Sequence, residues 1–74
     1  MNGTTFNPDD VAVEISRHFS SYHTSPLVVY VGERDGCHEF SVRVKNHQIA
    51  EALNALEEYL SNPVPYRISV YTTV

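Results

Sequence analysis

The stretch LVVYVGERDGCHEFSVRVK, residues 27–45, predicts a β-hairpin. Residues 27–31 form an apolar, β-branched and aromatic run, which is typical of a strand covered on both faces. Residues 37–45 alternate apolar and polar side chains, as in a strand with one face in the core and the other in water. The loop between them, residues 32–36, ends in Asp35-Gly36, where glycine can adopt the positive φ of a tight turn. We therefore expect two antiparallel strands, with residues 27–31 at the centre of the sheet.

A helix is predicted before the hairpin, beginning at Asn-Pro-Asp-Asp, residues 7–10. Asn7 can cap the helix, Pro8 suits its first position, and the two aspartates that follow favour the positive end of the helix dipole. Phe6 and Val11 have the spacing of a hydrophobic staple. An apolar stripe then continues at helical spacing to about Tyr22, which sets the expected end of the helix.

A second helix is predicted after the hairpin, with Asn46 as its cap and Ser61-Asn62-Pro63 at its end. Its apolar stripe consists of Ile49, Ala52, Leu53, Leu56 and Leu60. Residues 66–74 alternate again and predict a third strand. The order is helix, hairpin, helix, strand (α-β-β-α-β), a single small α+β domain over residues 1–74.

The three strands should form a mainly antiparallel sheet. A crossover through the second helix allows strand 66–74 to lie beside either strand of the hairpin. We expect the order 2-1-3, because strand 27–31 has apolar residues on both faces and so suits the centre. The second helix should cover the face that carries Phe40, Val42 and Val44, while the first helix either shares that face or covers the other.

Composition limits the kind of protein. The chain has 74 residues, one cysteine and a formal net charge of −4. One cysteine cannot form an intrachain disulfide, and the acidic balance disfavours nucleic acid and anionic lipid as partners. The longest apolar run, residues 27–31, is far shorter than the roughly 20 residues of a membrane span. Residues 1–5 lack the features of a secretory signal, so we expect a cytoplasmic protein, in the host cytoplasm if it is viral.

No residue pattern indicates an enzyme, a metal site or a cofactor. The four histidines, at positions 18, 23, 38 and 47, match no metal-ligand spacing. Cys37 and His38 are adjacent, but neighbouring strand residues point to opposite faces, so they should not form a nucleophile and base. A small enzyme completed across a dimer interface by His38, His47 and Cys37 is the least favoured hypothesis.

The favoured function is a non-catalytic binding protein that docks on a larger macromolecule. Its expected contacts are apolar residues on the outer sheet face and on the first helix, two glutamates of an acidic ridge on the second helix, and one arginine: Val13, Val28, Tyr30, Tyr71, Glu51, Glu58 and Arg67. The partner should be a protein, and a symmetric homodimer through a strand edge or the outer sheet face is a further expectation.

Size and acidity resemble those of small phage-encoded inhibitors of host defence, so an anti-CRISPR-like inhibitor of a nucleic-acid-handling enzyme is one form of this hypothesis. The acidic ridge would then occupy the space that phosphates take in the enzyme's basic groove. The alternative is a single-stranded nucleic-acid-binding module that uses Tyr30, Arg43, Arg67 and Tyr71 on an aromatic and basic sheet face.

Overall fold

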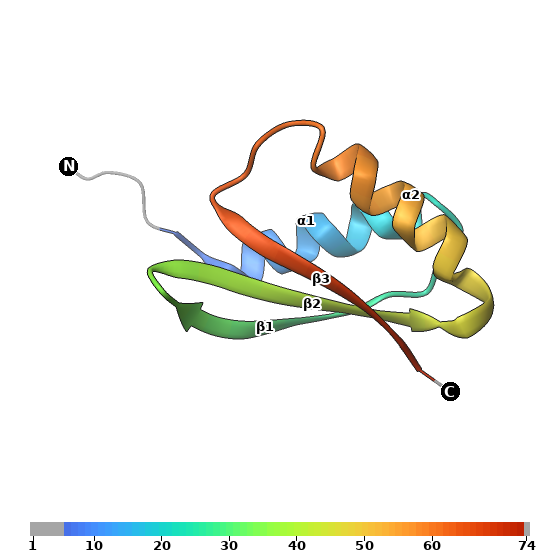
Figure 1. Ribbon diagram of the computed structural model, residues 1–74, viewed down its shortest axis with the longest axis horizontal. Helices are drawn as coiled ribbons and strands as arrows, with labels where there is room; N and C mark the ends of the chain where they lie inside the picture. The colour runs from blue at the N-terminus through green and yellow to red at the C-terminus, as the bar shows by residue number, and fades with distance from the viewer. Residues whose placement is uncertain (1–5, 74) are drawn as a thin grey trace.

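The structure is a computed structural model that describes residues 6–73 (Figure 1). The predicted order of elements is confirmed. The helices and strands are α1 (Pro8–Ser20), β1 (Leu27–Arg34), β2 (Cys37–Lys45), the short 3-10 helix η1 (Asn46–Gln48), α2 (Ile49–Tyr59) and β3 (Tyr66–Thr73). The expectation about residues 1–5 and the predicted last strand residue, Val74, lie outside the described residues.

The start of α1 is the predicted one. The side-chain oxygen of Asn7 accepts hydrogen bonds from the backbone N–H groups of Asp9 at 3.0 Å and Asp10 at 3.4 Å, and Pro8 is the first helical residue. These bonds satisfy two of the donors that a helix start leaves without partners. The helix ends at Ser20, two residues before the predicted Tyr22, and His23 then takes a positive φ of 64°.

The sheet is mixed and has the order β1-β2-β3, so both the predicted order 2-1-3 and the predicted mainly antiparallel pairing are wrong. β1 pairs with β2 antiparallel, and β3 pairs with β2 parallel, with Phe40 opposite Ile68 and Val42 opposite Val70. Phe40, Val42 and Val44 of β2 are at most 1% exposed, whereas every residue of β1 is at least partly exposed. Apolar residues on both faces of β1 therefore do not indicate a central strand. They reflect an apolar row that the rest of the described chain leaves exposed.

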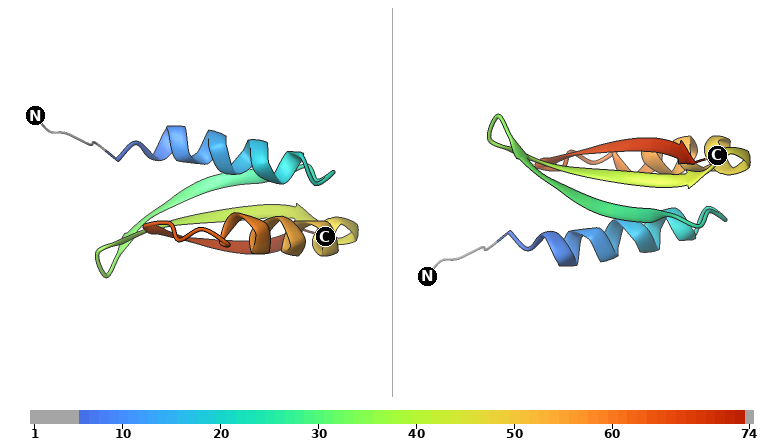
Figure 2. Two further views of the ribbon diagram at one scale, coloured as in Figure 1. Left: turned by 90° about the horizontal axis from the view of Figure 1, so that it is seen from above. Right: turned by 90° about the horizontal axis from the view of Figure 1, so that it is seen from below.

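Both helices pack on one face of the sheet (Figure 2). α1 lies along the β1 side and α2 lies over β3. The core between the layers consists of Ile15, Phe19, Phe40, Val42, Val44, Ala52 and Ala55. The imidazole Nε2 of His18 is 2.9 Å from the carbonyl oxygen of Ala55, which joins the two helices directly. α1 thus shares the face covered by α2, one of the two arrangements that the sequence allowed.

The second helix begins differently from the prediction. Asn46 starts η1 instead of capping an α-helix, and the side-chain oxygen of Gln48 accepts hydrogen bonds from the N–H groups of Lys45 and Ser25. The predicted apolar stripe is partly wrong as well, since Leu53 is 51% exposed and Leu60 is also exposed. The fully buried line is Ala52 and Ala55, whose small side chains let α2 approach the sheet and α1 closely. No helix in the described part of the chain is long and apolar enough to cross a membrane.

Candidate functional site

The sheet face opposite the helices is the candidate site. The strands lie in front of α2 when the molecule is seen from below, and no described element covers them (Figure 2, right). Cross-strand pairing places Leu27 beside Arg43 and Arg43 beside Tyr71 on this side. We call it the open face; its residues are Leu27, Val29, Val31, Arg34, Cys37, Glu39, Ser41, Arg43, Lys45, Arg67, Ser69, Tyr71 and Thr73.

Three aliphatic side chains follow one another along the β1 side of the open face. Leu27 is 61% exposed, Val29 43% and Val31 60%, and we call them the aliphatic row. Tyr71, 52% exposed, adds an aromatic side chain on β3. Single exposed apolar residues are ordinary on protein surfaces, but a contiguous group rimmed by polar residues is typical of an interaction site.

Charge is segregated between the two sides of the molecule. The open face carries four of the five basic residues of the chain and one of its nine acidic residues, so its formal charge is +3. The rest of the chain has Arg17 and eight acidic residues, a formal charge of −7. The net charge of −4 therefore does not describe the surface that the sheet offers to a partner.

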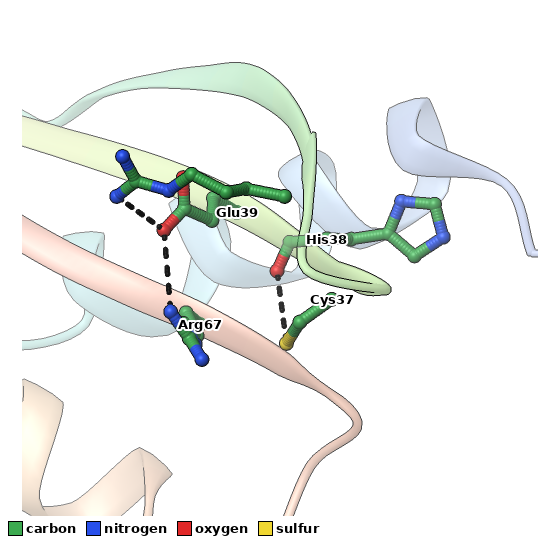
Figure 3. A network of polar contacts seen from close by, with 5 residues as sticks. Cys37, His38, Glu39 and Arg67 are labelled. Carbon is green, nitrogen blue, oxygen red and sulfur yellow. Dashed lines mark hydrogen bonds and ion pairs between the residues drawn. The ribbon is translucent and has the colours of Figure 1, made fainter.

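One carboxylate organises the basic residues at the centre of the open face. The side chain of Glu39 is 17% exposed and accepts from Arg34 at 3.2 Å, while Arg67 Nη1 lies 3.8 Å away (Figure 3). Glu39 thus occupies two of the three arginines of this face. Arg43, the third, is exposed and forms no ion pair with any described residue.

A hollow lies beside this network. Its volume is about 310 Å³, and it is lined by Val31, Arg34, Glu39, Phe40, Ser41, Arg43, Ser69 and Tyr71. Ser41 is only 8% exposed as a residue, but its hydroxyl oxygen opens into the hollow, because no fully buried side-chain oxygen or nitrogen of residues 6–73 lacks a hydrogen-bond partner. Ser69 pairs with Ser41 on the neighbouring strand, so two hydroxyl groups lie side by side between an aliphatic wall and a basic one.

The predicted contact residues fall on different surfaces. Arg67 and Tyr71 lie on the open face, as predicted. Val28 and Tyr30 do not, because both point toward the helices; the hydroxyl of Tyr30 lies 2.6 Å from His38 Nδ1. The prediction that these two residues face outward is wrong.

A β-bulge next to Gly32 decides which face Tyr30 takes. The turn pairs Arg34 with Cys37, and a regular register counted back from that pair would place Tyr30 opposite Ser41 on the open face. The register shifts between Tyr30 and Gly32, so Tyr30 instead pairs with Phe40, on the core side. Gly32 has a φ of 134°, which few other residues adopt. The aliphatic row was not among the predicted contacts, and Gly32, which was expected in the loop at residues 32–36, is the residue that could have indicated the bulge.

The other predicted contacts lie on the helical side. Val13 lies on the rim of a groove of about 580 Å³ between α1 and β1, whose lining also includes Ser16, Arg17 and Leu27. Glu51 and Glu58 are exposed on α2. Desolvation and, as a smaller effect, the nearby Glu58 carboxylate raise the pKa of Tyr22. The predicted acidic ridge is thus separate from the open face.

The histidines and the cysteine do not converge. Within residues 6–73, no three His, Cys, Asp or Glu side chains are grouped to hold a metal ion. His38 points toward the core side, where its ring stacks on Phe6 with centroids 3.9 Å apart. Cys37 Sγ donates a weak hydrogen bond to the His38 backbone carbonyl at 3.7 Å, while the imidazole points away from it (Figure 3). Thiol and imidazole are therefore not arranged as a nucleophile and its base.

Neither a protein-family model, nor a curated protein, nor a solved structure matches the chain. The function is therefore inferred from the open face itself.

Proposed function

We propose that this protein is a non-catalytic binding protein that docks on a larger macromolecule through its open face. The observation that carries this proposal is the aliphatic row, which lies uncovered beside a basic strip on the open face of the sheet. A sheet positions such side chains precisely without needing them for its own core, because the core of this chain is on the other face.

The magnitude of the apolar contribution indicates how such a complex would be held. Fully burying a Val or Leu side chain is worth about 1.5–3 kcal/mol, and the row is about half exposed, so covering it would contribute on the order of 2–4 kcal/mol. Since about 4 kcal/mol corresponds to a dissociation constant of about 1 mM and about 2 kcal/mol to tens of millimolar, the row alone gives at best millimolar affinity. A specific complex therefore also requires the polar and charged groups beside the row.

The sign of the charge selects the kind of partner. The net charge of −4 favours a basic or neutral partner, but the open face, at +3, favours an acidic one. An inhibitor that occupies a basic groove would instead use the helical side, with Glu51 and Glu58. We favour the open face because its charges adjoin an exposed aliphatic row.

Single-stranded nucleic acid is the second candidate partner, because Arg43, Lys45, Arg67 and Tyr71 share the open face. Binding of this kind needs aromatic side chains on which bases stack. With Tyr30 turned to the core, Tyr71 is the one aromatic side chain that the described residues place on this face, and Arg67 lies within ion-pair distance of Glu39. These two features favour a protein partner.

The test is position-specific photo-crosslinking in the native cell. A benzoylphenylalanine at Val29 samples the open face, and one at Leu53 samples an equally exposed apolar site on α2. We expect a discrete protein adduct from position 29, whose formation decreases when the unlabelled protein is added in excess. We expect no adduct from position 53. Equal adducts from both positions, or an adduct from position 53 alone, would show that the open face is not the docking surface.

The mass of the adduct separates the remaining partners. An adduct of twice 8.4 kDa would identify a second copy of the chain, as expected for a homodimer through the outer sheet face. An adduct that disappears on nuclease treatment would identify nucleic acid and would reject the protein partner.

A further inference from the structure

We propose that the hollow on the open face receives a side-chain carboxylate from an acidic segment of the protein partner, while apolar side chains of the same segment lie on the aliphatic row. This inference rests on the proposed function and names the chemistry of the partner. It is carried by one hydroxyl that opens into the hollow, one arginine without an ion pair among the described residues, and the position of both beside the row.

Ser41 is the first of these groups. A hydroxyl group can donate one hydrogen bond and accept others, so one that opens into a hollow can bond to water or to a ligand. Ser41 lies in the middle of the central strand and lines the hollow, and its hydroxyl is not an enclosed atom. Its hydroxyl is therefore available to donate to an acceptor that enters the hollow.

Arg43 is the second group, and it sets the charge of the ligand. Glu39 already lies within ion-pair distance of Arg34 and Arg67, so Arg43 is left as the arginine without an ion pair among the described residues lining the hollow. One available guanidinium matches one carboxylate, with which it can form paired hydrogen bonds. The Glu39 carboxylate, which also lines the hollow, would repel a dianionic phosphate about twice as strongly as a singly charged carboxylate, so a carboxylate is favoured.

The aliphatic row lies within reach of the same ligand. Val29, Ser41 and Ser69 are aligned across the three strands. Neighbouring strands are about 4.8 Å apart, so the row lies about 5 Å from Ser41 and about 10 Å from Ser69. One peptide segment can therefore place a carboxylate in the hollow and a neighbouring Leu or Val on the row. The motif expected in the partner is an acidic residue adjacent to aliphatic residues.

The probe is a short fluorescein-labelled peptide with Leu-Glu and Val-Asp pairs separated by glycine. Its control replaces each Glu by Gln and each Asp by Asn, which keeps the shape and removes the charge. We expect the acidic peptide to bind about tenfold more tightly than the amide peptide at about 50 mM NaCl, and the difference to shrink at about 500 mM. Fluorescence anisotropy measures both affinities.

Matched variants locate the binding. Arg43→Gln should weaken the acidic peptide about tenfold and leave the amide peptide unchanged, and Ser41→Ala should weaken it by about threefold. Arg17→Gln removes the same charge from α1, away from the open face, and should change neither affinity by more than about twofold. Amide chemical shifts should move at Ser41 and Ser69 with the acidic peptide and lose that movement in Arg43→Gln.

The outcomes separate this inference from the proposed function. If both peptides bind equally, Arg43→Gln is neutral and Val29→Gln weakens both, the open face docks apolar segments and the carboxylate site is wrong. If neither peptide moves the open-face amides, the carboxylate site is also wrong, and crosslinking at position 29 decides whether docking itself fails. If only a single-stranded thymidine oligonucleotide binds, and Arg43→Gln abolishes that binding, the hollow does not recognise a protein carboxylate.

Discussion

The sheet order and the open face can be tested together by one pair of substitutions, Val42→Ala and Val29→Ala. Both remove the same two methyl groups from a strand valine, so the difference between the two losses of stability reports the surroundings of each valine. Val42 is 0% exposed, and its side chain points from the central strand into the core between the sheet and the helices. Val29 is 43% exposed and lies on an edge strand.

The expected magnitudes follow from burial. Removing two buried methyl groups costs about 1.6 kcal/mol of transfer free energy, and the remaining cavity raises the cost of Val42→Ala to about 2–3 kcal/mol. Val29 borders open solvent, so no closed cavity forms and Val29→Ala should cost about 1 kcal/mol or less. Against a total stability on the order of 4–10 kcal/mol for a chain of this length, the difference is readily measured.

The assay is urea unfolding followed by far-ultraviolet circular dichroism, because the chain has no tryptophan. Both variants should keep the wild-type dependence on urea and differ in the midpoint. A loss for Val29→Ala as large as that for Val42→Ala would refute the reasoning, since it would mean that β1 is covered on both faces. If that loss grew with protein concentration, the cover would be a second copy of the chain.

Two further predictions concern the bulge and the tyrosine pair. Gly32→Ala should destabilise the protein by about 1–3 kcal/mol, because the φ of 134° at this position is strained for any other residue, although no atom lies within 4 Å of the added methyl group. The control, Gly36→Asn, should be nearly neutral, because asparagine tolerates the φ of 75° at that position. Equal losses in the urea midpoints of the two variants would contradict this prediction. Burial and, to a lesser extent, the 2.5 Å hydrogen bond to the Tyr66 hydroxyl raise the pKa of Tyr59 above its ordinary 10.0. The unfolded chain therefore loses the Tyr59 proton at a lower pH than the folded protein does. The free energy of unfolding should consequently fall as the pH rises above 10.0. Above that pH, the urea midpoint of Tyr59→Phe should fall less steeply with pH than that of the wild type. Below it, the midpoints of both proteins should depend on pH in the same way. Identical slopes above that pH would exclude Tyr59 as the cause.

The sheet order escaped prediction because it depends on contacts far apart in the chain. The residues of β1 are apolar on both faces, and so are those of many central strands, so the pattern itself does not distinguish the two cases. The order of the strands depends on β3, which pairs with β2 along its whole length after the crossover through α2.

The candidate site was half predicted for a related reason. Arg67 and Tyr71 were placed correctly, because β3 alternates regularly and Ile68 and Val70 identify its core side. Val28 and Tyr30 were placed on the wrong side, because strand 27–31 is apolar on both faces and its alternation does not say which face is the core. The segregation of charge could not be read from the composition, since it depends on the side of the sheet to which each strand residue points.

The sequence by itself determined the local structure of this protein: the order of elements, the Asn7 cap, the turn at Asp35-Gly36 and the core row of β2. Each of these depends on residues within a few positions of one another, where propensity, capping and alternation act directly. The tertiary structure alone decided that β2 is central, that both helices share one face and that the aliphatic row and four of the five basic residues meet on the other. These features join segments distant in the chain, and the free energy that selects among their arrangements comes from the packing of the whole core.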